Sequence, residues 1–169
     1  QFETKPYWVM ATSGVGAKMK LAGRDENISA YISNDYLGMS QRPETIEAGI
    51  DALRKYGTGA CAAQAIGGYL DIHHKLEKEI AEFVGQEDAI LFSSGFGANT
   101  GLLRAILGKN DIAYVDSYIH TSATSGLRGT NIKHIGHNDI GYLDMILEKE
   151  AGKFKTRLVI IDGVYSQNG

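Results

Sequence analysis

Residues 89–99 read AILFSSGFGAN and contain the clearest structural signal in this chain. Four apolar residues end at two serines and a glycine, and a helical pattern of leucine and isoleucine follows near residues 98–107. This order predicts a strand, a tight turn and a helix N-terminus. Free backbone N–H groups and the helix dipole make such a terminus suitable for binding an anion. An ordinary turn without a ligand is the alternative, because glycine-rich turns are common.

The same alternation continues toward the end of the chain. Further strands are predicted at residues 112–115, 132–135 and 158–161, and further helices near 122–129 and 141–151. Strands that alternate with helices predict crossover connections and an α/β fold with a mostly parallel sheet flanked by helices. Ligands of such sheets bind at the carboxyl ends of the strands, where this chain has its polar turns.

The first 88 residues are less regular. Residues 1–40 are expected to form an N-terminal arm with a first short strand at 28–32. Pro43 opens a predicted helix that Gly57 ends, and a second helix is predicted over 73–84. The apolar positions of that second helix are expected to face inward: Leu76, Ile80, Phe83 and Val84.

Composition restricts the class of protein. The apolar fraction of 43% and the charged fraction of 22% are typical of a globular domain, and a net charge of -3 gives no reason to expect nucleic acid as a partner. No apolar run approaches the ~20 residues of a transmembrane helix, and no signal peptide is visible. The single Cys61 is compatible with a reducing compartment, so we expect a cytoplasmic protein. Both ends suggest a piece of a longer chain.

His120 is the best candidate for a binding or catalytic side chain, because it lies in the turn after the predicted strand 112–115. An imidazole there can stack on a planar ligand, bind a carboxylate or transfer protons, although a capping or surface role is the alternative. The other histidines lack the clustering of a metal site, so no metal is expected. No phosphate loop or dinucleotide fingerprint is present, and Ser94 and Ser166 do not lie in a nucleophile elbow.

Seven segments, taken in order, resemble the motifs of the α-oxoamine synthase family, a group of enzymes that depend on pyridoxal 5′-phosphate (PLP). They are SNDYLG at 33–38, YGTG at 56–59, HHKLE at 73–77, FSSGFGAN at 92–99, DSYIHTS at 116–122, HND at 137–139 and GVYS at 163–166. The resemblance implies that residues 41–169 are the N-terminal part of the large PLP-binding domain of a fold-type I enzyme.

The resemblance also implies roles for particular residues. Five positions match cofactor contacts of the family: Ser94, Gly95, Phe96, His120 and Ser166. In this match, the backbone amides of Gly95 and Phe96 hold the phosphate, and Ser166 lies near the phenolic oxygen of the cofactor. His120 matches the catalytic histidine that stacks on the pyridine ring and orients the substrate. Asn34 matches an asparagine close to the substrate carboxylate.

The reaction implied is the condensation of an amino acid with an acyl-CoA, with loss of CO2 and release of CoA, catalysed by a homodimer. Two features depart from the family pattern. Gln64 stands where the family has an arginine, and the lysine that binds the cofactor covalently is expected beyond Gly169, so this segment alone is expected to be inactive. The segments YGTGAC at 56–61 and LDIH at 70–73 are most similar to serine palmitoyltransferases. A non-catalytic partner subunit and another fold-type I enzyme, an aminotransferase or a lyase, are the alternatives.

Overall fold

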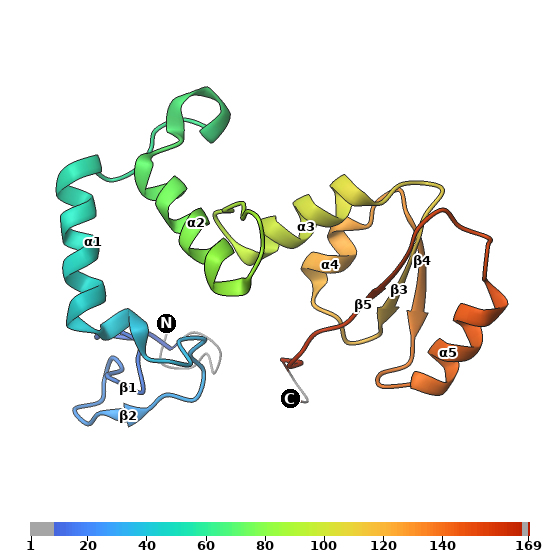
Figure 1. Ribbon diagram of the computed structural model, residues 1–169. Coiled ribbons are helices and arrows are strands. Elements are labelled where there is room, and N and C mark those ends of the chain that lie inside the picture. Colours follow the sequence, from blue (N-terminus) through green and yellow to red (C-terminus); the bar gives the residue numbers. More distant parts are fainter. Residues whose placement is uncertain (1–8, 167–168) are drawn as a thin grey trace. The chain divides into compact units, whose positions relative to one another are not determined.

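The computed structural model describes residues 9–166 and residue 169, and the chain forms two compact units that divide between Asp71 and Ile72. Figure 1 shows the elements of both units in sequence colours. The elements of the first unit are the antiparallel strands β1 (Lys18–Met19) and β2 (Ile28–Ser29), the short helix η1 (Met39–Gln41), α1 (Pro43–Tyr56) and the turn η2 (Gln64–Gly68). As predicted, α1 begins at Pro43 and ends at Gly57, whose positive φ of 77° suits a glycine.

Helix α2 (Asp71–Val84) confirms the second predicted helix but not its inward face. Phe83 is 91% exposed and Val84 54% exposed, whereas Glu77 and Ala81 are buried. The prediction of an inward apolar face was therefore wrong for the described chain. Helical periodicity shows which face of a helix could be covered, but burial requires another element to cover it. No helix among residues 9–166 is long and apolar enough to cross a membrane.

The second unit contains the predicted parallel sheet. Besides α2, which begins at the unit boundary, its elements are α3 (Gly95–Ile106), β3 (Ile112–Asp116), α4 (Thr121–Gly126), β4 (Asn131–Ile135), α5 (Ile140–Lys149) and β5 (Arg157–Ile160). The strand order is β4-β3-β5, and β3 pairs in parallel with both neighbours, Ala113 lying opposite Ile132 and Leu158. The alternation of strands and helices therefore predicted the α/β fold correctly.

One predicted strand is absent from the described residues. Residues 89–92 follow α2 without joining a sheet, so the prediction of a strand there was wrong for this chain segment. The backbone N–H of Leu91 instead donates to the carboxylate of Glu77 at 3.0 Å. The ring of Phe92 packs against α3 at Gly101, where an added Cβ would lie 3.0 Å from the ring. An apolar run becomes a strand only when another strand accepts and donates its backbone hydrogen bonds.

Helices cover both faces of this sheet, with α3 and α4 on one side and α5 on the other (Figure 1). Alternate residues of β3 enter the two cores, because successive side chains of a strand point to opposite faces. Ala113 and Val115 pack against α3 and α4, whereas Ile112 and Tyr114 pack against α5. Strand β3 is therefore packed on both of its faces. Its carboxyl end leads directly into the turn that carries His120.

Candidate functional site

The N-terminus of α3 has two backbone donors available for a ligand. Ser94 is its N-cap, and the N–H of Gly97 donates to the Ser94 hydroxyl oxygen at 3.0 Å. The N–H of Ala98 donates to the Ser94 carbonyl. Gly95 and Phe96 occupy the two preceding helical positions, whose N–H groups have no intrahelical acceptor. Gly95 is exposed, and nothing lies within 4 Å of a Cβ placed on it.

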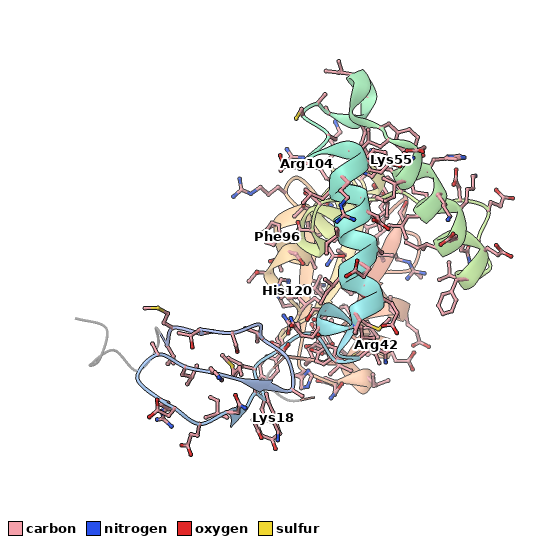
Figure 2. The ribbon with its side chains drawn as sticks, turned by 90° about the vertical axis from the view of Figure 1, so that its left-hand side faces the viewer. Lys18, Arg42, Lys55, Phe96, Arg104 and His120 are labelled. Atoms are coloured by element: carbon pink, nitrogen blue, oxygen red, sulfur yellow. The ribbon has the colours of Figure 1, made fainter. Side chains whose placement is uncertain are left out.

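His120 lies at the other candidate position, in the turn between β3 and α4. Figure 2 labels it together with Phe96 at the start of α3. The His120 backbone N–H donates to the carboxylate of Asp162, after β5, at 3.1 Å. Its side chain caps α4, because the N–H of Ser122 donates to Nδ1 at 3.2 Å. The imidazole is therefore held from both its backbone and its ring, which limits its freedom to rotate.

Helices α3 and α4 are joined closely beside these two positions. The Asn99 side-chain amide donates to the Ser122 hydroxyl oxygen at 2.9 Å. Gly126 allows the two helices to approach, since a Cβ at this position would lie 2.9 Å from Cα of Thr100. Asn99 is one helical turn, about 6 Å, after Gly95. The N–H groups at the start of α3 and the imidazole at the start of α4 thus lie on two helices that pack directly against each other.

A pocket of about 280 Å³ opens at the carboxyl ends of β3 and β5. It is lined by residues 117–121, which include His120, and by Tyr165 and Ser166. The structure therefore brings together two of the residues predicted from the sequence, His120 and Ser166, from segments 46 positions apart (166 − 120). This position at the strand ends is the one that parallel α/β sheets use for ligands.

A cluster around Asp116 supports the wall of this pocket. Asp116 is buried at the end of β3, and Nδ1 of His137 donates to its carboxylate at 3.0 Å. The His137 ring stacks on Tyr118 with 4.7 Å between centroids and meets Tyr165 edge-on at 4.6 Å. Because Tyr118 and Tyr165 both line the pocket, the cluster connects the ends of all three strands beneath it.

Charge is stabilised at the centre of this cluster. Burial alone would raise the pKa of Asp116, but the N–H groups of Tyr118 and Asn138 and the imidazole of His137 all donate to its carboxylate and hold the pKa below its usual value. Burial raises the pKa of the neighbouring Tyr165 hydroxyl. At neutral pH the cluster therefore holds an ionised carboxylate beside a protonated phenol.

Asn34 lies in the first unit, in an exposed turn before α1. The turn is held by its neighbour Asp35, whose carboxylate accepts hydrogen bonds from the backbone N–H of Met39 at 2.8 Å and the Ser40 hydroxyl at 2.6 Å. The Ser40 hydrogen bond is the main cause of the lowered pKa of Asp35. Gly38 adopts a positive φ of 65° in the same turn. Asn34 is thus presented on an ordered turn, in a different unit from His120.

The donors of the second unit suit PLP chemically. Two backbone N–H groups at a helix N-terminus match a phosphate, an imidazole face matches a flat aromatic ring, and a serine hydroxyl matches a phenolic oxygen. Gly95 and Phe96, His120 and Ser166 supply these groups in that order. Among residues 9–166, no group of three or more His, Cys, Asp or Glu side chains is placed to hold a metal ion.

Comparison with known proteins now defines the class. Residues 32–169 match the family model for aminotransferase class I and II, so the chain belongs to that family. An 8-amino-7-oxononanoate synthase of Saccharophagus degradans is 38% identical over 95% of this chain and 40% of its own length. A serine palmitoyltransferase of Bacteriovorax stolpii is 40% identical over 81% of this chain and 33% of its own length. The chain thus spans less than half of each relative.

Solved structures agree with these relatives. The serine palmitoyltransferase of Sphingomonas wittichii superposes with a TM-score of 0.87 at 31% identity, over 96% of this chain and 41% of the other. A serine palmitoyltransferase from S. paucimobilis, solved with bound PLP and myriocin, gives a TM-score of 0.89 at 28% identity over the same shares. Within the class I and II family, the chain therefore fits the α-oxoamine synthase group, and its fold is the N-terminal part of a fold-type I PLP enzyme.

Sequence reasoning missed the residues that support the site. Ser122 and His137 were visible only as parts of the HTS and HND segments, and Asn99 only as the end of FSSGFGAN. Polar residues two positions from a candidate histidine are a weak signal, because their partners lie on other elements. The helix cap at Asp139 is a local feature, because this polar residue directly precedes α5 and the N–H of Tyr142 donates to its carboxylate at 2.9 Å.

Proposed function

We propose that the protein containing this chain is a PLP-dependent α-oxoamine synthase that condenses an amino acid with an acyl-CoA, with loss of CO2 and release of CoA. Residues 41–169 form the N-terminal part of its large domain and contribute one wall of the cofactor site. Residues 1–40, of which 1–8 lie outside the described residues, form the arm. One observation carries the proposal. In a member of this family, the helix whose N-terminal N–H groups have no intrahelical acceptor is hydrogen-bonded through Asn99 and Ser122 to the imidazole of His120.

Each residue has a defined task in this proposal. The N–H groups of Gly95 and Phe96 bind the phosphate, and the Ser94 hydroxyl keeps the first turn of α3 in place. His120 lies against the pyridine ring and orients the substrate, and Ser166 donates to the phenolic oxygen. When bound, the cofactor supplies an electron sink for the carbanion chemistry, and the protein contributes position and electrostatics.

The remaining expectations belong to the whole protein. Asn34 contacts the substrate carboxylate, the enzyme is a homodimer, and it acts in the cytoplasm on an amino acid and an acyl-CoA. The similarity of the chain to curated serine palmitoyltransferases and 8-amino-7-oxononanoate synthases supports this substrate class. One observation favours a second candidate, a non-catalytic partner subunit: Gln64 lacks the fixed charge of the arginine that the family pattern has there.

The phosphate role of α3 can be tested by removing one backbone donor. Proline is favoured at the first helical position, and the extended conformation of Ser94 (φ −160°, ψ 154°) accepts a following proline. Gly95→Pro should therefore keep the helix but delete one N–H to the phosphate. We expect PLP to bind the whole protein about 10- to 100-fold more weakly. The control Gly95→Ala retains the N–H and has open space for its Cβ.

The activity itself is measured as CoA release when the whole protein receives PLP, an acyl-CoA and each of a panel of amino acids. CoA release with at least one amino acid is the expected result. A folded protein that does not bind PLP would support the partner-subunit alternative. Equal affinities for PLP in Gly95→Pro and Gly95→Ala would contradict the phosphate role of α3.

A further inference from the structure

The imidazole of His120 is the end of a short chain of polar groups that starts on α3. Asn99 Nδ2 lies 2.9 Å from Oγ of Ser122, and that oxygen lies 2.7 Å from Nδ1 of His120. Ser122 is only 1% exposed, so its hydroxyl has these two partners rather than water. These hydrogen bonds therefore connect a residue of α3 to the ring of His120, a residue that lines the pocket.

One group among these residues can only donate, and it indicates which of the others donate and which accept. The backbone N–H of Ser122 is a donor in every state, and it points at Nδ1 of His120 from 3.2 Å. This contact favours the tautomer of His120 in which Nδ1 is an acceptor without a proton of its own. The Ser122 hydroxyl must then donate its proton to Nδ1, which leaves its oxygen to accept from the Asn99 amide.

We propose that Asn99 and Ser122 are positioning residues that hold His120 in the neutral tautomer with its proton on Nε2. An imidazole whose Nδ1 accepts two hydrogen bonds keeps its single proton on the opposite nitrogen. This inference rests on the proposed function. In that function, Nε2 of His120 presents an N–H donor, rather than a lone pair, to a substrate carboxylate in the pocket.

The same contacts place the ring relative to the candidate phosphate site. Asn99 lies on the helix whose first residues, Gly95 and Phe96, present free N–H groups. Gly126 lets α4 approach α3 to within direct backbone contact. A shift of α3 relative to α4 would therefore break the Asn99–Ser122 hydrogen bond, and His120 would no longer be restricted to one tautomer.

The tautomer can be measured directly in the whole protein before any cofactor is added. Long-range ¹⁵N–¹H correlation spectra of histidine-labelled protein distinguish a proton on Nε2 from one on Nδ1, and a His120→Gln variant assigns the signal. We expect a single Nε2–H pattern for His120. A proton on Nδ1, or two tautomers in the unmodified protein, would overturn the proposal.

Asn99→Asp is the decisive variant, because it is nearly isosteric and reverses the polarity of the chain. A carboxylate only accepts, so the Ser122 hydroxyl would donate to it and could no longer donate to Nδ1. We expect the single Nε2–H pattern of His120 to be lost and Nδ1-protonated ring to appear. Asn110→Asp is the matched control, since it adds the same charge at an exposed turn and should leave the pattern unchanged.

A second pair of variants removes the hydroxyl itself. Ser122→Ala leaves Nδ1 with only the longer backbone hydrogen bond, so we expect a smaller loss of the Nε2–H pattern than in Asn99→Asp. Ser125→Ala, on the same helix, is its control. An unchanged tautomer in both Asn99→Asp and Ser122→Ala overturns the proposal. PLP affinity is measured separately on the unmodified protein, so a failure of the proposed function is distinguished from a failure of the positioning role.

Discussion

The imidazole of His137 and the carboxylate of Asp116 lie 3.0 Å apart, and their hydrogen bond joins the ends of β3 and β4 beneath the pocket. Asp116 belongs to the central strand, so this contact anchors the turn that leads to His120. The edge-on contact of His137 with Tyr165 extends the support to the residue next to Ser166. Asp116 and His137 therefore help to position two candidate cofactor contacts, His120 and Ser166. The family resemblance assigns no role to either member of this pair.

Stability should depend on the ionisation of Asp116 at low pH. The pKa of this carboxyl is held below its ordinary value of about 3.9, because its hydrogen bonds outweigh the effect of burial. Its contribution to stability is therefore complete above about pH 4 and is lost as the pH falls through the lower pKa of the folded state. Asp116→Asn should be less stable by about 1–3 kcal/mol near neutral pH.

The measurement for Asp116 is the unfolding midpoint as a function of pH. The difference between the unmodified protein and Asp116→Asn should shrink as the solution is made more acidic, because protonation removes the same charge from the unmodified protein. Asp144→Asn changes an exposed carboxylate on α5 and serves as a control. A constant difference at every pH would show that ionised Asp116 does not stabilise the fold.

Ser94 should stabilise α3 as its N-cap. The Gly97 N–H donates to its hydroxyl, and Ser94→Ala leaves that donor without a side-chain partner. We expect a loss of about 1 kcal/mol in the free energy of unfolding, measured by chemical denaturation. Ser93→Ala removes the neighbouring hydroxyl, which lies outside the cap, and should change stability by less than half as much. Equal losses in the two variants would argue against the cap.

Gly126 should tolerate no side chain. A Cβ there would lie 2.9 Å from Cα of Thr100 and 3.1 Å from the carbonyl oxygen of Asn99, so Gly126→Ala forces α3 and α4 apart. We expect thermal unfolding to report a destabilisation of about 1–3 kcal/mol. Gly141→Ala on α5 is the matched control, since its nearest neighbour atom would be 3.9 Å away. That control should be neutral or stabilising by up to about 1 kcal/mol, and the reverse order would refute the packing argument.

His120→Ala should impair the reaction of the whole protein without unfolding it, because the ring is exposed and lies at the pocket. Loss of an orienting group typically lowers the rate by about 100-fold. We expect kcat for CoA release to fall by this order while the thermal unfolding midpoint changes little. His134→Ala on β4 replaces another exposed histidine and should retain full activity. Unchanged turnover in His120→Ala would remove His120 from the catalytic site.

Several features of the site could be predicted from local pattern alone. The cap at Asp139 follows from a polar residue that precedes helical periodicity, and the position of His120 follows from the predicted strand 112–115, which ends at Asp116 in the structure. The extended run at 89–92 could not be predicted correctly in the same way. Its sequence is typical of a strand, but strand formation depends on a hydrogen-bonding partner elsewhere in the fold.

The amino-acid sequence by itself determined the alternation of strands and helices, the caps and the family motifs, because these depend on periodicity and turn chemistry within a few residues. Only the tertiary structure decided which polar groups meet. Asn99 and Ser122 are 23 positions apart, and Asp116 and His137 are 21 apart, yet each pair is hydrogen-bonded. Such pairs depend on how helices pack on the sheet, and the packing geometry is set by many side chains together rather than by any local pattern.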